Sequence, residues 1–208
     1  MCASYESRFN VRQLVKVFDK AGAPLDVSAG LPNLAEADEI RPTDRATVVL
    51  AGDDRRPVLQ TLSFGFPPPR AKAGPIINLR SEGRTFANHE RGGRCLIPMS
   101  GFYEFTGNRY PKTRWVFRDP DEPLLCLAGV WRPGDPGEAS AFALLTTEPG
   151  PDIAPYHDRG VVVVPSSRWA DWLFGAFPAD LIVASAPGTL AVHAAPRPPK
   201  RPTGGLLD

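Results

Sequence analysis

Apolar residues near the start of the chain recur with a helical spacing. Four of them fall at positions i, i+3, i+4 and i+7, namely Val11, Leu14, Val15 and Phe18. Gly22 follows this pattern and is a typical residue for the end of a helix. The spacing therefore predicts one amphipathic helix over residues 8–20.

The rest of the chain contains short apolar runs bounded by Gly, Pro or Asp, which are typical of strands. These runs are Thr47–Leu50, Val58–Phe64, Arg114–Phe117, Leu124–Val130, Phe142–Thr146, Val161–Val164 and Leu181–Ala184. Residues 24–42, which include an acidic stretch, are expected to be a loop, and a helix is expected from Ser166 or Ser167 through Phe174. The pattern predicts an α+β fold with a curved, barrel-like, mainly antiparallel sheet and a few short helices.

Composition limits the class of protein. The 24 prolines and 19 glycines make up about a fifth of the 208 residues, which favours loops and short strands over a helical bundle. We expect a single domain over residues 1–193 and a mobile, proline-rich, basic tail over 194–208. No apolar run is long enough for a membrane span and no secretory signal is seen, so a cytoplasmic protein is expected. The net charge of +1 favours no acidic partner.

The three cysteines, Cys2, Cys95 and Cys126, argue against a disulfide framework or a zinc site because their number is odd and no CxxC spacing occurs. We expect no metal and no cofactor. Cys95 and Cys126 lie in apolar runs and are expected to be buried. Cys2 differs, because removal of Met1 would place an α-amine and a thiol on one residue. Such a residue can condense with an aldehyde to a thiazolidine; the alternative is a chance cysteine at the terminus.

Three polar residues lie next to apolar segments. Glu104 stands among aromatic residues, which would remove water from its carboxylate and raise its pKa toward the range of a general acid or base. His157, followed by Asp158 and Arg159, could shuttle protons or contact a phosphate. Asn78 directly follows two isoleucines. The structural alternatives are a turn cap for Asn78, a surface ion pair for Glu104 and a packing role for His157.

Six motifs occur in the order found in one protein family. They are Met1-Cys2, the Asn-x-Arg-x-Glu of 78–82, the Arg-Cys-x-Ile-Pro-x-x-Gly-Phe-Tyr-Glu of 94–104, the Ala-Gly-x-Trp of 128–131, the Thr-Thr-Glu of 146–148 and the His-Asp-Arg of 157–159. Over about residues 1–193 the chain resembles the SRAP (SOS response-associated peptidase) family, which processes abasic sites. The resemblance implies a covalent thiazolidine crosslink between Cys2 and an abasic site in single-stranded DNA, and possible self-removal of Met1.

The resemblance also implies roles for individual residues. Asn78 would orient Cys2 and the opened sugar, Glu104 would act as the general acid and base, and His157 would assist proton transfer and reversal. The expected DNA contacts are Arg80, Thr146, Arg159 and Arg70. They would include a phosphate clamp by the planar guanidinium of Arg80. The implied partner is single-stranded DNA with abasic sites, bound by a monomer without a membrane or an obligate protein partner.

Several positions depart from the family pattern. Ala3 and Ser4 stand where the family commonly has Gly and Arg, prolines 67–69 stand where a DNA-stacking Pro-x-Trp is usual, and the usual C-terminal segment is reduced to Val192-His193-Ala194. These changes leave the implied chemistry intact and affect DNA binding. Basic residues gather between 70 and 94, which favours a local basic groove. The alternatives to crosslinking are a thiol peptidase acting on peptides and a non-catalytic module that binds single-stranded DNA.

Overall fold

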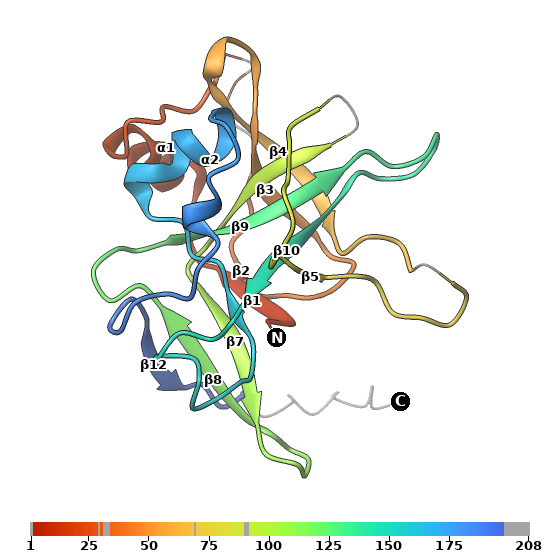
Figure 1. The fold of residues 1–208 in the computed structure, drawn as a ribbon, viewed down its shortest axis with the longest axis vertical. Coiled ribbons are helices and arrows are strands. Elements are labelled where there is room, and N and C mark those ends of the chain that lie inside the picture. Colours follow the sequence, from red (N-terminus) through yellow and green to blue (C-terminus); the bar gives the residue numbers. More distant parts are fainter. Residues whose placement is uncertain (1, 29, 31–33, 69, 90–91, 198–208) are drawn as a thin grey trace, which may run out of the picture.

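The computed structural model describes residues 2–28, 30, 34–68, 70–89 and 92–197. Two sheets form most of the molecule (Figure 1). The predicted α+β class, with a mainly antiparallel sheet and short helices, is confirmed.

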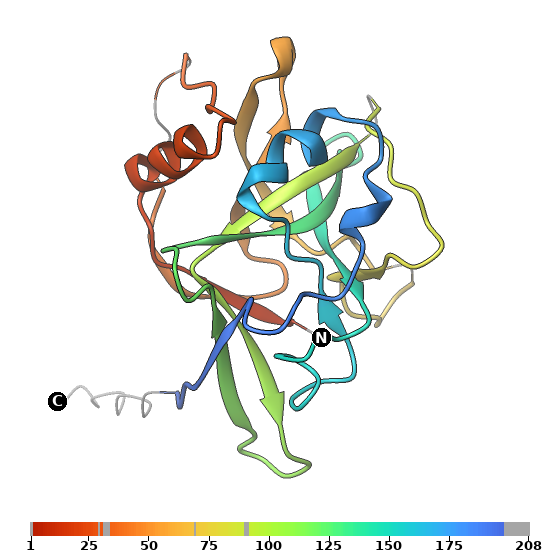
Figure 2. The ribbon, with the colours of Figure 1, turned by 60° about the vertical axis from the view of Figure 1, so that its left-hand side comes forward.

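The first sheet has five strands in the order β12-β8-β7-β1-β2. Their bounds are β1 Ser4–Ser7, β2 Ala37–Ile40, β7 Gly101–Thr106, β8 Thr113–Arg118 and β12 Ala191–Ala194. Every pairing along this path is antiparallel. The β7–β8 hairpin extends away from the rest of the molecule in both ribbon views (Figures 1 and 2).

The second sheet has seven strands and curves until it meets itself. Its strands are β3 Arg45–Ala51, β4 Pro57–Phe64, β5 Asn78–Arg80, β6 Gly93–Met99, β9 Leu125–Arg132, β10 Ala141–Thr147 and β11 Gly160–Val161. Strand β10 pairs in parallel with β4 and antiparallel with β9, which closes a ring through β3 and β6. Gly129 lies at this closure, where an added Cβ would stand 2.2 Å from Ile97 Cδ1 and 2.9 Å from the Ala143 carbonyl oxygen. This close approach explains the glycine of the Ala-Gly-x-Trp motif.

Two α-helices cover the ring. Helix α1 (Val11–Lys20) begins at a capping box in which Asn10 Oδ1 accepts from the Gln13 backbone N–H. Helix α2 (Trp169–Phe174) follows a 3₁₀ turn, η2 (Ser166–Arg168). The rings of Phe18 and Trp169 pack 4.3 Å apart and join the two helices. Two further 3₁₀ turns are η1 (Asp53–Arg55) and η3 (Ala179–Leu181). Both predicted helices are confirmed.

Three sequence expectations are corrected. The acidic segment expected to be a loop contains strand β2, because β1 offers it a pairing edge. The run 181–184 forms no strand; η3 ends at Leu181, and Val183 is 56% exposed. The run 161–164 contributes only Gly160–Val161 and an isolated bridge at Val163.

The core has two parts. One lies under the helices and includes Leu14, Phe18, Leu96 and Trp172. The other contains residues of the ring, such as Val48 and Leu127, together with Tyr5 of β1 and the preceding Cys2. Cys95 and Cys126 are buried, as predicted. The Cys2 sulfur is therefore placed within the packed interior.

The first residues of the predicted tail lie against the first sheet. Ala194 pairs with Trp115, the Ala195 backbone N–H donates to the Arg114 carbonyl, and Arg197 lies 3.2 Å from Glu39. Residues 198–208 lie outside the described residues. Among the described helices, none is long and apolar enough to cross a membrane.

Candidate functional site

Cys2 and Asn78 come together from distant parts of the sequence. Cys2 lies two residues before the first residue of β1, and Asn78 begins β5, which pairs in parallel with β10. Asn78 Nδ2 donates to the Cys2 carbonyl oxygen at 3.1 Å. Its other amide atom, Oδ1, is buried without a hydrogen-bond partner among the described residues. The Asn78 side chain therefore hydrogen-bonds to the Cys2 backbone and does not cap a turn.

The Cys2 thiol is fully buried and its sulfur lies 3.5 Å from the Ser4 carbonyl oxygen. Burial raises the pKa of Cys2, and the negative charge of nearby Glu104 raises it further. The sulfur is therefore held as a neutral thiol. Met1, the residue before it, lies outside the described residues.

Glu104 is on β7, opposite Trp115 of β8, and only 3% of it is exposed. Burial raises the pKa of Glu104 to about 7. The negative charge of Asp158, the residue after His157, raises the pKa of Glu104 further. Glu104 is therefore not a surface ion-pair partner, and its carboxyl can give or take a proton near neutral pH.

His157 follows a turn, and its backbone N–H donates to the Ile153 carbonyl. Its Nδ1 accepts the Arg159 backbone N–H at 2.9 Å. Burial lowers the pKa of His157 despite the carboxylate of Asp158, which lies 2.8 Å from Nδ1 but is 89% exposed. Nδ1 is therefore engaged within its own loop by a backbone N–H and a carboxylate, and Nε2 is the ring nitrogen that can act on a substrate.

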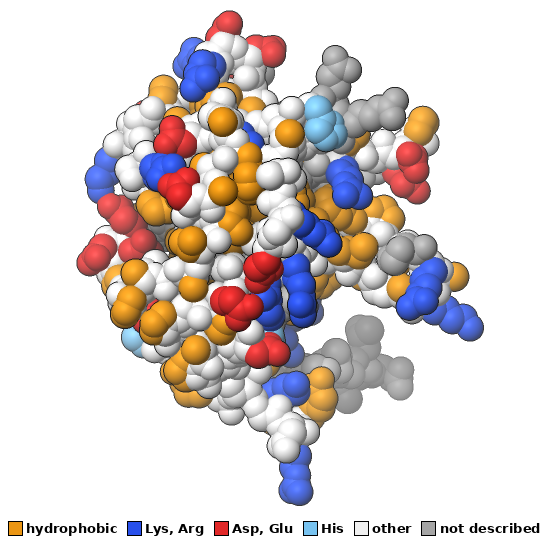
Figure 3. Space-filling model, in the orientation of Figure 1, with side chains coloured by type: hydrophobic (Ala, Val, Ile, Leu, Met, Phe, Trp, Pro, Cys, Tyr) orange, Lys and Arg blue, Asp and Glu red, His pale blue; other side chains and the backbone are white. Residues whose placement is uncertain are grey.

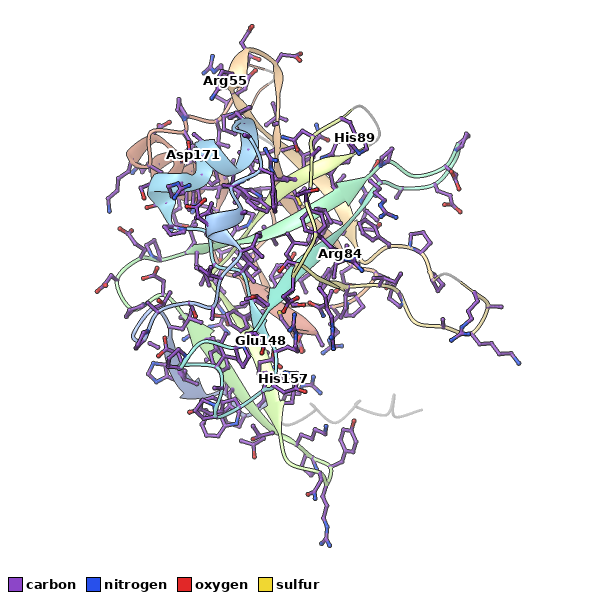
Figure 4. All side chains as sticks on the ribbon, viewed as in Figure 1. Arg55, Arg84, His89, Glu148, His157 and Asp171 are labelled. Atoms are coloured by element: carbon purple, nitrogen blue, oxygen red, sulfur yellow. The ribbon has the colours of Figure 1, made fainter. Side chains whose placement is uncertain are left out.

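Arg159 is paired with two carboxylates. Its guanidinium donates to Glu82 at 2.9 Å, lies 3.3 Å from Glu148 and reaches the Thr146 hydroxyl at 3.4 Å. Thr146 is fully buried and donates to the Leu79 carbonyl. The expected direct DNA contact by Thr146 is therefore not supported, since its hydroxyl is already used inside the protein. Figure 4 shows Glu148 and His157 together, near the end of β10.

The basic residues between 70 and 94 separate into two groups. Arg70, Lys72, Arg80 and Arg84 are exposed. Arg94 is buried and donates to the carbonyls of Trp172, Phe86 and Gly175, so it joins α2 to the ring and does not belong to a basic surface. Arg91 lies outside the described residues.

Figure 3 shows Lys and Arg side chains around a hollow between the β4–β5 loop, which carries Arg70 and Lys72, and the β7–β8 hairpin. In Figure 4, Arg84 lies above Glu148 and His157 on this face. The exposed cations thus lie around the hollow between the β4–β5 loop and the β7–β8 hairpin.

Sequence reasoning missed Glu6, a fully buried carboxylate on β1. It accepts from Arg118 Nε at 2.6 Å and from the Tyr103 hydroxyl at 2.8 Å. Burial alone would raise the pKa of Glu6, but these hydrogen bonds outweigh it and the pKa lies below its usual range. Glu6 fastens β1 to β7 and β8, and thereby Cys2 to Glu104. Its position in an ordinary polar run offered no sequence signal.

The described residues contain no group of three or more His, Cys, Asp and Glu side chains that could hold a metal ion. The assembled site is thus a buried thiol, an amide, a carboxyl that titrates near neutral pH and a neutral imidazole, with cations at the surface. Together these groups can hold a nucleophile beside a carbonyl carbon and transfer protons to and from the carbonyl oxygen.

Known proteins resemble this chain in fold and sequence. A protein from Bordetella bronchiseptica aligns with a TM-score of 0.73 at 20% identity, covering 94% of this chain and 100% of that one. A protein from Bacteroides thetaiotaomicron aligns with a TM-score of 0.70 at 18% identity, covering 97% of each chain. These likenesses concern the fold.

Two curated relatives, both named abasic site processing protein YoqW, come from Bacillus subtilis (strain 168) and from Bacillus phage SPbeta. Each is 29% identical over 140 residues, and the match spans 61% of the relative's length and 61% of this chain. The sequence also matches the family model described as SOS response associated peptidase (SRAP) over residues 1–188. The chain therefore belongs to the SRAP family.

Proposed function

We propose that this protein processes abasic sites in single-stranded DNA by forming a covalent thiazolidine through Cys2, after Met1 has been removed. The observation that carries the proposal is the convergence of Asn78 and Glu104 on Cys2, with Asn78 bound to the Cys2 backbone at 3.1 Å. The names of the curated relatives agree with an abasic substrate.

The proposed reaction begins at nitrogen. The free α-amine of Cys2 adds to the C1′ aldehyde of the ring-opened sugar, and the resulting carbinolamine loses its hydroxyl as water to give an imine. The Cys2 thiol then adds across the C=N bond. The sulfur bonds to C1′ while its proton passes to nitrogen, so one water is lost overall and no oxidant is needed.

The state of each side chain supports this order. Because burial raises the pKa of the Cys2 thiol, the sulfur is a poor first nucleophile, which also argues against a thiol peptidase. Glu104, with a pKa of about 7, can protonate the leaving hydroxyl and later accept a proton from sulfur. His157 can donate from Nε2 to the sugar, and the unpartnered Asn78 Oδ1 can accept from the amine or a sugar hydroxyl.

The DNA contacts are proposed for exposed cations. Arg80, two residues after Asn78 on β5, and Arg70 in the β4–β5 loop are free to meet phosphates at the surface. Arg159 would reach a phosphate only by leaving Glu82 and Glu148. Charge-assisted contacts of guanidinium to phosphate suit these positions.

The test uses purified protein and a single-stranded oligonucleotide with one abasic site. We expect a heat-stable shifted band on a denaturing gel, with the mass of protein plus DNA less one water. Cys2→Ala should form no such band without a reductant. Cys2→Ser supplies the matched control, because it keeps the amine but lacks sulfur and should give only an imine, trapped by borohydride. Intact mass of the protein reports whether Met1 is gone. Failure of Met1-free protein to form the band would overturn the proposal.

A further inference from the structure

The outer end of the β7–β8 hairpin carries a groove of about 770 Å³. Its lining includes Phe105, Tyr110, Lys112, Arg114, Pro196 and Arg197. The hairpin projects from the molecule in Figures 1 and 2, so this groove is open on a protruding element. None of these residues takes part in the chemistry proposed for Cys2.

The groove and the Cys2 site use opposite faces of the same ribbon. Glu104 pairs with Trp115, and Phe105 pairs with Arg114. Because successive side chains of a strand point to opposite faces, Phe105 and Arg114 face away from Glu104. The groove is therefore a separate surface that begins one residue beyond the proposed catalytic carboxyl.

Aromatic rings and cations alternate in the groove. The Tyr110 side chain is 89% exposed, and the Lys112 ammonium lies 6.0 Å from its ring centroid. At the other side, the Arg197 guanidinium lies 5.6 Å from the centroid of Phe105. The exposed Tyr110 ring offers a face on which a planar group can stack, and the cations beside the two rings offer contacts for anions.

The charge around the groove is predominantly positive. The lining holds the cations Lys112, Arg114 and Arg197 and no acidic residue. The Glu39 carboxylate, next to the groove, lies 3.2 Å from Arg197 and 3.7 Å from Arg114. Lys112 has no ion pair among the described residues. The complementary occupant is therefore an anionic chain that carries planar rings.

We propose that this groove binds single-stranded nucleic acid, and specifically the nucleotides that flank the abasic one, so the inference rests on the proposed function. Tyr110 lies in the turn between β7 and β8, six residues beyond Glu104 and therefore at most ~20 Å from it. A flank of ten nucleotides spans this distance even if its bases stay stacked at ~3.4 Å per nucleotide, whereas two nucleotides at that spacing fall short. A base stacks on the exposed Tyr110 ring while phosphates meet Lys112 and Arg197.

The experiment measures equilibrium binding of single-stranded oligonucleotides by fluorescence anisotropy in the full chain carrying Cys2→Ala, which cannot close a thiazolidine and leaves no stable crosslink. Probes have two or ten nucleotides on the 5′ side or the 3′ side of the abasic position. With one of the two polarities, ten nucleotides should bind about 5- to 10-fold more tightly than two. The double variant Tyr110→Ala, Lys112→Ser should lose this gain and leave the affinity for the short probe unchanged.

The matched control is Arg55→Asn, which removes another cation placed over a ring, that of Phe174 at 5.5 Å. Arg55 lies at the far end of the molecule from the hairpin (Figure 4), so this variant should keep the full gain. A probe with 5-iodouracil in the long flank should photo-crosslink to a peptide that contains Tyr110. Thermal melting checks that each variant is folded.

Equal affinity for short and long flanks, or an equal loss in the control, would overturn the inference. So would displacement of the long probe by a proline-rich peptide at concentrations at which it binds the groove, because the groove would then be a protein-binding surface. The proposed function is judged separately, by the covalent band of the protein that retains Cys2. If the covalent band forms but affinity does not depend on flank length, only the proposed role of the groove is wrong. If affinity depends on flank length but no covalent band forms, only the proposed crosslinking reaction is wrong.

Discussion

Glu104 is the residue at which the site's chemistry and the protein's stability meet. Its pKa of about 7 lies above the usual 4.5, so the folded protein binds this proton more tightly than the unfolded chain. The contribution of Glu104 to stability is therefore complete below about pH 4.5 and is lost as the pH rises through 7. Relative to wild type, Glu104→Gln should gain about 3 kcal/mol of unfolding free energy between pH 4 and pH 8.

Urea unfolding of both proteins across this pH range measures the difference, and other titrating groups cancel in the comparison. Glu36→Gln, at an exposed acid, should run parallel to wild type. The same Glu104 variant should form the abasic crosslink about 100-fold more slowly, as is typical for loss of a general acid or base. Parallel stability curves for Glu104→Gln and wild type would contradict the raised pKa.

Arg159 is held by two carboxylates, of which Glu148 is 76% exposed and 3.3 Å away. Releasing Arg159 to meet a phosphate requires breaking these contacts, of which the one to the exposed Glu148 is worth a few tenths of a kcal/mol. Glu148→Gln should therefore strengthen noncovalent binding of single-stranded DNA about 2-fold at low salt. Glu138→Gln removes the same charge from the exposed β9–β10 connection and should change binding less. An equal gain in both variants would attribute the effect to net charge alone.

At the scale of elements, β1 is the strand that follows Cys2, and the buried Glu6 carboxylate holds this strand in place. Its cation partner Arg118 is 39% exposed and stays hydrated, so the loss is that of the charge-assisted hydrogen bonds to Glu6, about 2 kcal/mol. We expect Glu6→Gln to lose about that much stability in urea unfolding and to slow crosslinking, since Arg118 and Tyr103 lose their acceptor. Asp38→Asn is the matched control, because Asp38 also pairs with Arg8 but is 90% exposed. Similar losses in the two variants would show that burial of Glu6 is not what matters.

Strands could be predicted where the segment itself has an apolar pattern. They could not be predicted where strand formation depends on the presence of a partner strand. Runs such as 47–50 and 58–64 were assigned correctly because their side chains pack on both sides of the ring. Strand β2 was missed because Asp38 and Glu39 are typical of a loop, although Glu39 is in fact paired with Arg41 and Arg197. The run 181–184 has strand composition but no strand beside it to pair with in the described part of the chain. Which strands lie side by side is set by the whole fold, and a local sequence pattern does not show it.

The convergence of Cys2, Asn78 and Glu104 was predicted through the family resemblance, and the polar residues among apolar ones gave the physical hint. The sequence did not show which arginines and lysines are paired inside the protein and which are exposed. Arg94 and Arg159 are as basic in sequence as Arg80, but backbone carbonyls occupy the first and carboxylates the second. Only the assembled molecule separates buried guanidiniums from those at the surface.

At the scale of the whole molecule, a net charge of +1 cannot supply DNA affinity by itself, so binding must come from a local group of cations. Arg70, Lys72, Arg80 and Arg84 are exposed near the proposed site. If these four meet phosphates, log K should fall with log salt at a slope of about −3 for single-stranded DNA. The binding of intact single-stranded DNA to Cys2→Ala protein, measured at several salt concentrations, gives this slope.

The β4–β5 loop should carry part of that slope, because it extends beside the hollow in Figure 3 and holds two of the four cations. Replacing Arg70 and Lys72 by Ser should make the slope shallower by about 1.4. Replacing Arg12 and Lys16, two exposed cations on α1, by Ser lowers the net charge equally and should leave the slope unchanged. Equal effects of the two pairs would mean that long-range attraction rather than contact governs binding, and the loop would then have no part in holding DNA. A shallower slope for the loop pair alone would show that its cations take up the phosphate contacts there, although the prolines leave it without a stacking tryptophan.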